Sequence, residues 1–147
     1  MPGFGDSALN PPQVNYYQLV TGDEAATAAA AAAAHQATAA MLSAEIATMT
    51  TSTTSTAAVG WQGAGGAAMT MTAQAFAGIL GMAVAWFEEA VVQATAIVDA
   101  YHLAKTTMVP GPVSDQNLVD TEALVATNFI GQNSPAIAAL VAAARPT

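Results

Sequence analysis

Gly60-Trp61-Gln62-Gly63-Ala64-Gly65-Gly66 decides the fold of this chain of 147 residues. Long alanine-rich stretches lie on both sides of it. Its glycines permit positive φ angles and a close approach of two backbones, so the segment predicts a tight Trp-x-Gly turn between two long antiparallel helices. Trp61 is expected to close this end of the hairpin by packing its ring over both helices.

The stretch before the turn predicts a helix over residues 22–58. It contains no proline and is dominated by alanine, the strongest helix former. Thr21 and Glu24 have the spacing of a capping box, with Thr21 as the N-cap. The part from Thr48 to Thr56 is rich in threonine and serine, which form helices less well, but a helix is expected there because the flanking turns must pack.

The stretch after the turn predicts a second helix over residues 64–108, ended by Pro110 and Pro112. Its larger apolar residues recur mostly at steps of three or four, which places them on one face of a helix. A hairpin of two helices has little interior, so we expect another chain to cover this stripe. The stripe consists of Met69, Phe76, Leu80, Ala83, Phe87, Val91, Ala94, Val98 and Tyr101. Three further apolar residues lie beside it and widen it, namely Ile79, Trp86 and Ile97.

Residues 1–20 are expected to form an extended arm. Asn10 and Pro11 each precede a proline, which disfavours the α conformation at both positions. A frayed terminus is the plain alternative. The aromatic and apolar residues between Val14 and Val20 favour an arm that is anchored on the rest of the chain.

Two short helices are expected after Pro112, over residues 114–130 and 135–144. Ser114 or Asp115 is placed to cap the first, Gly131 is placed as its stop, and Ser134-Pro135 suits the start of the second. The link between them forms a tip in which large apolar residues stand beside side-chain amides. The tip consists of Leu124, Asn128, Phe129, Ile130, Gly131, Gln132 and Asn133.

Exposed apolar residues at such a tip would mark a binding site. The alternative is that Phe129 and Ile130 fold back onto the long helices as ordinary core. Together the elements predict a single all-α domain over residues 1–147, built from an antiparallel hairpin and a short helical pair.

The composition limits the function of the chain. It is 54% hydrophobic but only 8% charged, with a net charge of −8, and a helical protein with so few charges needs much of its surface covered. Two basic residues are too few to neutralise phosphates or to bind anionic membranes, so no nucleic acid is expected as a partner. The run from Ile79 to Phe87 is too short to cross a bilayer, and no transmembrane segment is expected.

No residue pattern supports catalysis, a cofactor or a metal. Residues at equal distances from the turn pair across the hairpin, which places His35 opposite Phe87 rather than His102. Glu88 and Glu89 are adjacent, so they point to different faces of a helix. The glycines of the turn lack the lysine of a phosphate-binding loop, and the chain has no cysteine. An enzyme is therefore not expected.

The chain resembles the N-terminal domain of the mycobacterial PPE family over nearly its whole length. Pro11-Pro12-Gln13 is similar to the Pro-Pro-Glu of that family, with glutamine in place of glutamate, and Trp61-Gln62-Gly63 is similar to its Trp-x-Gly turn. The most specific likeness is residues 125–138, Val-Ala-Thr-Asn-Phe-Ile-Gly-Gln-Asn-Ser-Pro-Ala-Ile-Ala, which resemble the helical tip of the family. After Ala138 the family continues through a Tyr and Met-Trp region that is missing here, which suggests a shortened chain.

This resemblance implies an assembly protein. PPE proteins pair with two-helix PE proteins along their long helices, a type VII (ESX) secretion system exports the pair, and an EspG-type chaperone binds the tip in the cytoplasm. The implied location is the cytoplasm before export, and afterwards the medium or the cell surface. A self-associating structural helical bundle is the alternative, and a soluble, well-folded homodimer formed by the chain alone would favour it.

Overall fold

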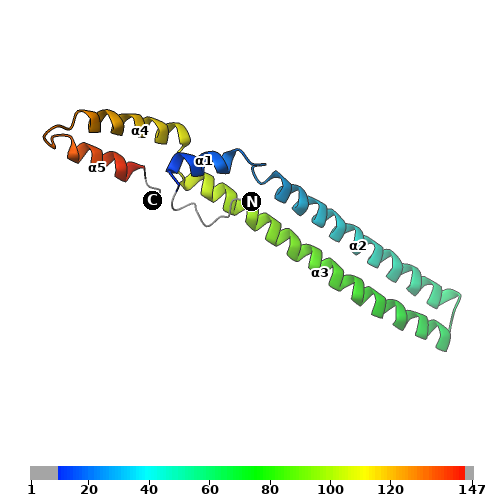
Figure 1. Cartoon of the computed structure of the whole chain (residues 1–147). Helices are drawn as coiled ribbons and strands as arrows, with labels where there is room; N and C mark the ends of the chain where they lie inside the picture. The colour runs from blue at the N-terminus through cyan, green and yellow to red at the C-terminus, as the bar shows by residue number, and fades with distance from the viewer. Residues whose placement is uncertain (1–9, 145–147) are drawn as a thin grey trace. The chain divides into compact units, whose positions relative to one another are not determined.

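The computed structural model describes residues 10–144, and this part of the chain forms helices and no strand. The helices are α1 (Pro12–Val20), α2 (Ala26–Val59), α3 (Ala64–Thr107), α4 (Gly111–Ala126) and α5 (Ser134–Ala143), as Figure 1 shows. The all-α prediction is therefore confirmed. The chain has two compact units, Ala26–Val98 and Met1–Ala25 with Asp99–Thr147.

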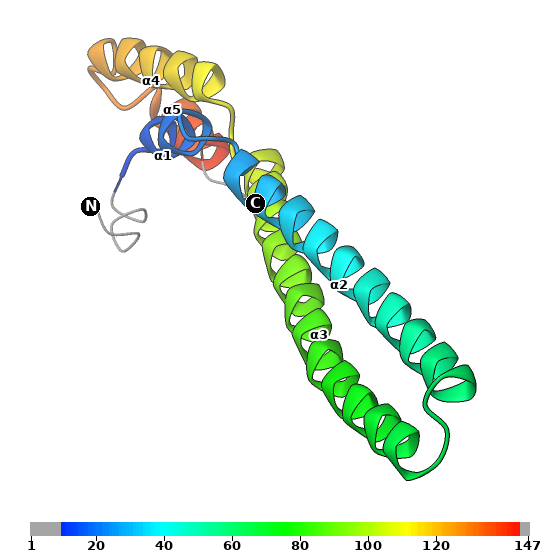
Figure 2. The same ribbon diagram turned by 90° about the vertical axis from the view of Figure 1, so that its right-hand side faces the viewer.

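The unit Ala26–Val98 is the expected antiparallel hairpin of two long helices, in which α2 lies beside α3 (Figure 2). The most buried residues of its seam are small: the buried hydrophobic residues of the described chain are Ala39 and Ala94. The rings of His35 and Phe87 lie 5.7 Å apart across the seam. This contact confirms the pairing at equal distances from the turn.

The threonine-rich end of α2 is helical, as expected. Thr48, Thr50 and Thr54 each donate a hydroxyl hydrogen bond to the carbonyl four residues earlier, over 2.8 to 3.0 Å. These bonds give each hydroxyl a partner within its own helix. The exposed surface of this part of α2 is therefore less polar than its sequence suggests.

The turn between α2 and α3 is held by backbone hydrogen bonds and by the conformation of its glycines. The amides of Gly60 and Trp61 both donate to the carbonyl of Thr56, at 2.9 and 3.0 Å. Gly63 has a φ of 91°, which residues with a side chain rarely adopt. A β-carbon at Gly66 would lie 1.7 Å from the carbonyl oxygen of Trp61, so only glycine fits at this crossing.

The side chain of Trp61 does not close the hairpin. It is 61% exposed, so the expected packing of the indole over both helices is wrong for this chain. The space beside the first turn of α3 is taken by the carbonyl of Trp61 and by the backbone of Ala57. The ring is therefore left projecting from the turn.

Gly66→Ala should destabilise the hairpin by about 3 kcal/mol, because the new methyl group can be accommodated only by moving the backbone of the turn. Gly78→Ala is the matched control, since a β-carbon at this helical position meets nothing within 4 Å. It should leave the free energy of unfolding unchanged or raise it by about 0.5–1 kcal/mol. Thermal and urea unfolding of the two variants measures the difference, and equal losses of stability would contradict this account of the turn.

The second unit contains α1, α4, α5 and the end of α3. The extended arm expected over residues 1–20 is wrong for residues 12–20, which form α1; residues 1–9 lie outside the described part. Pro11 is extended, with a ψ of 146°, but Pro12 occupies the first helical turn. Proline fits there because its missing N–H would have no helical partner anyway.

The expected capping box at the start of α2 is also wrong. Thr21 ends α1 instead, and its hydroxyl donates to the carbonyl of Tyr17 at 2.6 Å. Glu24 and Ala25 have φ angles of 52° and 62°, and this left-handed pair delays the start of α2 to Ala26. Glu24 accepts from the ammonium of Lys105 at 3.1 Å, in an exposed ion pair that contributes little to stability.

Helix α1 packs on α4 at a glycine. A β-carbon at Gly111 would lie 2.7 Å from Cζ of Tyr17 and 2.8 Å from Cδ1 of Tyr16, so the absent side chain makes room for both rings. The hydroxyl of Tyr17 donates to Asp115 at 2.8 Å. This bond, with the negative charge of Asp115, raises the pKa of Tyr17 above its usual 10.0.

This bond gives the contact between α1 and α4 a pH dependence. It is present while Tyr17 is protonated and is lost as the pH rises through the raised pKa, so the contact should weaken above pH 10.0. Asp115→Ala should lower the pKa of Tyr17, as the absorbance of tyrosinate measures, whereas Asp120→Ala, on the same helix, should not. An unchanged tyrosine titration in Asp115→Ala would exclude the interaction in solution.

Helix α4 begins three residues earlier than expected and ends four residues earlier. Pro112 lies in its first turn, so Ser114 is not a cap but is buried, with 4% of its surface exposed. Helix α5 packs on α4, and the amide of Asn117 donates to the carbonyl of Leu140 at 2.9 Å. Asn133, rather than Ser134, precedes the first residue of α5.

The helical stretch Ala64–Ala126 is long and apolar enough to cross a membrane, with an 18-residue window of mean hydropathy 1.6. This finding differs from the expectation of no transmembrane segment, for which the run from Ile79 to Phe87 was judged too short. This criterion rests on length and composition alone, and core helices of soluble proteins also meet it. Glu88 and Glu89 lie exposed on α3, and carboxylates are costly inside a bilayer.

Candidate functional site

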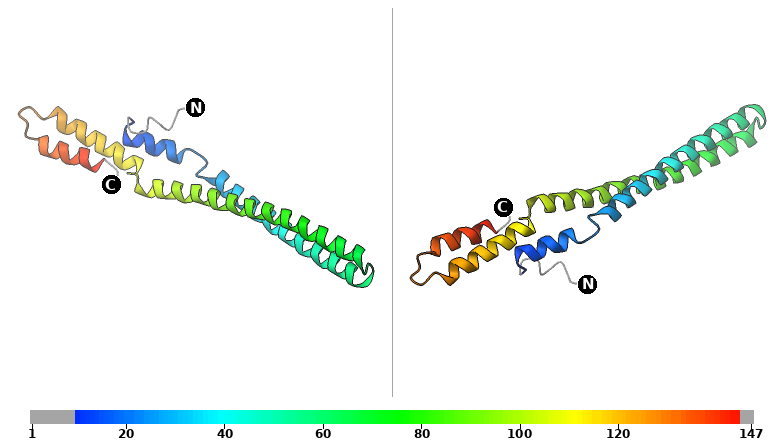
Figure 3. Two further views of the ribbon diagram at one scale, coloured as in Figure 1. Left: turned by 90° about the horizontal axis from the view of Figure 1, so that it is seen from below. Right: turned by 90° about the horizontal axis from the view of Figure 1, so that it is seen from above.

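The loop between α4 and α5, residues 127–133, forms the tip of this helical pair (Figure 3). Asn133 holds the loop to α4: its side-chain amide donates to the carbonyl of Leu124 at 2.9 Å and to the hydroxyl of Thr127 at 2.8 Å. Its backbone amide donates to Oδ1 of Asn128, also at 2.9 Å. The two asparagines therefore fix both ends of the loop.

Gln132 and Gly131 fix the middle of the loop. The side-chain amide of Gln132 donates to the carbonyl of Thr127, and its Oε1 accepts from the backbone amide of Ile130 at 3.0 Å. Gly131 has a φ of 81°, which favours glycine. It does not stop α4 as expected, since that helix ends at Ala126; instead it turns the loop toward α5.

The two large apolar residues of the tip point away from the protein. Phe129 is 87% exposed and Ile130 is 89% exposed, so the alternative in which they form core is wrong for this chain. Their neighbours in the loop satisfy the local backbone groups, and the loop needs neither side chain for its own packing. The structure thus brings all seven predicted tip residues together, with an apolar centre and a rim of amides.

The stripe that we predicted as a partner face lies mostly in the seam of the hairpin. Phe87 contacts His35 of α2, Ala94 is buried, and Leu80 is half-buried on the same face. Phe76 is the one exposed member. The remaining members are half-buried and comprise Met69, Ala83, Val91, Val98 and Tyr101. The half-burial of most members and the contact of Phe87 with His35 show that α2 shares this face of α3, and the contact of the stripe with a partner stays a prediction.

A second apolar face of α3 is exposed, and we call it the outer stripe. Trp86 is its most exposed member, at 77%. Successive members of this stripe are three, four or eleven residues apart, which places them near one side of the helix. This side lies next to the seam. The outer stripe consists of Phe76, Ile79, Met82, Trp86 and Ile97. Three of these residues were noted in the sequence only as a widening of the first stripe.

The described residues contain no group of three or more His, Cys, Asp or Glu side chains that could hold a metal ion. His35 packs against Phe87, and His102 lies against Tyr101 with ring centroids 5.5 Å apart. Both histidines thus contact aromatic rings rather than carboxylates. What the two surfaces offer is apolar contact area, which suits protein binding.

A model of the PPE family matches residues 6–145. PPE51 of Mycobacterium tuberculosis strain H37Rv, which is named a transporter, is 35% identical over 134 residues, or 91% of this chain and 35% of the relative. PPE21 of the same strain is 47% identical over 83 residues, or 56% of this chain and 12% of the relative. PPE45 of Mycobacterium bovis is 43% identical over 79 residues, or 54% of this chain and 19% of the relative. The chain thus spans at most 35% of these relatives.

Proposed function

The chain belongs to the PPE family, and from that premise we propose that it is a non-enzymatic subunit of a heterodimer with a PE-like helical protein. A type VII (ESX) secretion system exports this heterodimer, and an EspG-type chaperone binds the tip before export. The chain is then cytoplasmic before export, and afterwards it is secreted or associated with the cell surface.

The observation that carries this proposal is the outer stripe on α3. Five large apolar side chains are exposed on one helix that is itself packed on only one side. Exposed apolar faces of this extent mark interaction surfaces. A helical partner laid along α3 would cover the outer stripe and complete a bundle around the hairpin.

The composition of the hairpin supports the same partner class. The seam between α2 and α3 buries only alanine among its hydrophobic residues, so the hairpin gains little free energy from its own packing. Alanine along α2 also permits the close approach of another backbone. A two-helix partner is the shape that fits such a hairpin, because four helices can then share one core.

The tip supports the proposed chaperone contact. Phe129 and Ile130 form an apolar centre, and Asn128, Gln132 and Asn133 form a polar rim whose bonds hold the loop in shape. A loop that is already ordered loses little conformational entropy on binding. The tip and the outer stripe share no residue, so the two contacts can be tested separately.

Co-expression with PE-like proteins tests the proposal. A heterodimer of one copy of each chain, with its mass measured by native mass spectrometry, is the expected result, and the chain expressed alone should form no stable homodimer. A stable, soluble homodimer of the chain alone, together with no complex in co-expression, would instead favour the self-associating structural bundle.

A further inference from the structure

We propose that helices α1, α4 and α5 line a binding pocket for a neutral aliphatic molecule that carries one hydroxyl group. The pocket lies within one compact unit of the chain. Its volume of about 410 Å³ falls in the range of small-molecule sites. The residues that line it belong neither to the outer stripe nor to the tip, so this inference stands apart from the proposed function.

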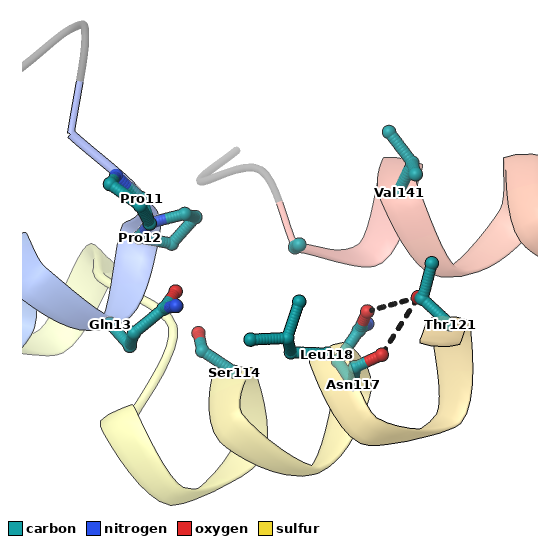
Figure 4. A pocket seen from close by; sticks show the side chains of 9 residues that line it. Pro11, Pro12, Gln13, Ser114, Asn117, Leu118, Thr121 and Val141 are labelled. Carbon is teal, nitrogen blue, oxygen red and sulfur yellow. Dashed lines mark hydrogen bonds between the residues drawn. The ribbon is translucent and has the colours of Figure 1, made fainter. Parts of the chain in front are cut away.

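The walls of the pocket are mainly apolar. Pro11 and Pro12 form one wall at the start of α1, and Leu118 and Val141 line it from α4 and α5, as Figure 4 shows. The two prolines have fixed φ angles, so this wall is rigid. The Pro-Pro segment that stood out in the sequence thus acquires a structural role, as one side of a preformed site.

A buried hydroxyl marks the place of a polar group. Ser114 lines the pocket, is only 4% exposed, and its Oγ has no hydrogen-bond partner in the described structure. A buried hydroxyl without a partner is costly. A ligand that reaches Ser114 with a donor or acceptor would remove this cost, which gives the site a preference beyond simple apolar contact.

The other polar groups narrow the choice of ligand. Asn117 already donates to the carbonyl of Leu140 and accepts from the hydroxyl of Thr121, at 2.9 and 3.4 Å. Gln13 lines the pocket from α1. The site therefore offers one unused hydroxyl and one amide, both of which can donate and accept.

Charge further restricts the ligand. No residue that lines the pocket is charged, and the whole chain has two basic residues against ten acidic ones. A carboxylate or ammonium group would lose its hydration in the pocket without gaining a counter-charge. A hydroxyl group on an aliphatic chain, which both donates and accepts, matches the walls and Ser114 together.

Titration of the full chain with 1-octanol tests this proposal, with binding followed by saturation-transfer NMR and by backbone amide shifts, alone and in complex with a PE-like partner. The amide shifts should centre on Gln13, Ser114 and Leu118. Ser114→Ala should weaken octanol binding about three- to tenfold, the usual effect of losing one hydrogen bond. Ser52→Ala, at an exposed serine of α2, is the matched control and should change nothing. Octanoate should bind more weakly than octanol.

A second variant does not depend on the hydroxyl. Leu118→Trp places a large ring at the half-open pocket and should prevent octanol binding while the helical circular dichroism stays unchanged. The proposal is overturned if octanol does not bind, if its shifts centre on Phe129 or on the outer stripe, or if Ser114→Ala and Ser52→Ala behave alike. It is also overturned if octanoate binds as tightly, or if octanol is excluded from the complex, since a side chain of the partner would then be the natural occupant.

Discussion

Replacing Ile79 and Trp86 together by aspartate should abolish the heterodimer while leaving the hairpin folded. Both side chains are exposed on the outer stripe of α3, so the chain itself does not need them for packing. In a complex, each aspartate would be buried without a partner charge, which is strongly unfavourable. A loss of at least about 4 kcal/mol, or about a thousandfold in affinity, is expected, and co-purification with size-exclusion chromatography measures it.

The matched control for this variant changes two residues of α3 that face the seam instead of the outer stripe. Leu80 and Phe87 are half-buried in the seam, so replacing both by aspartate should unfold the hairpin itself, with loss of helical circular dichroism. If the seam variant keeps its fold and loses only the partner, the assignment of the two faces is reversed. A stable heterodimer formed by the outer-stripe variant would contradict the proposed interface.

Phe129→Asp should abolish chaperone binding and leave the heterodimer intact. The ring is 87% exposed, and the loop that carries it is held by Asn133 and Gln132 rather than by the ring. Removing a central apolar anchor typically costs 2 kcal/mol or more, so the affinity for the chaperone should fall at least about thirtyfold. Pull-down of the variant heterodimer by an EspG-type chaperone measures the effect.

Val125→Asp provides the control for the tip. Val125 is an exposed apolar residue on α4, just before the loop, and it belongs to neither the predicted tip nor the outer stripe. Chaperone binding should weaken much less in this variant than in Phe129→Asp. Loss of the heterodimer in Phe129→Asp would show that the two contacts are not separate.

The hairpin and the tip could be read from the sequence because local signals agree there. Glycines at the turn, alanine in α2 and a helical period in α3 all favour the same structure, and the contact of His35 with Phe87 confirms the pairing that follows from them. The exposure of Phe129 and Ile130 also follows from local chemistry, since Gly131 and two asparagines fix a loop around them. The binding of a PE-like partner and of a chaperone remains a prediction.

The errors share two physical causes. Pro112 was placed before a helix and Pro135 at the edge of another, yet proline is accepted throughout the first turn, so α4 and α5 begin earlier than expected. Pro12 likewise lies in the first turn of a helix where an extended arm was expected.

The second cause is that periodicity shows which residues share a face but not what covers that face. For the stripe with Leu80 and Phe87, periodicity did not show that α2 contacts part of the same face, as the contact of Phe87 with His35 does. The contact of this stripe with a partner remains a prediction.

The small core of this chain has a consequence for its abundance in the cell. Because Ala39 and Ala94 are its buried hydrophobic residues within the described part, a copy without a binding partner has little free energy to resist unfolding. Proteases act on such opened copies, whereas binding holds the rest in the folded state. We therefore expect surplus copies to be degraded. The amount of this protein in the cell should then follow the amount of its binding partner, even when the two are not synthesised in equal amounts.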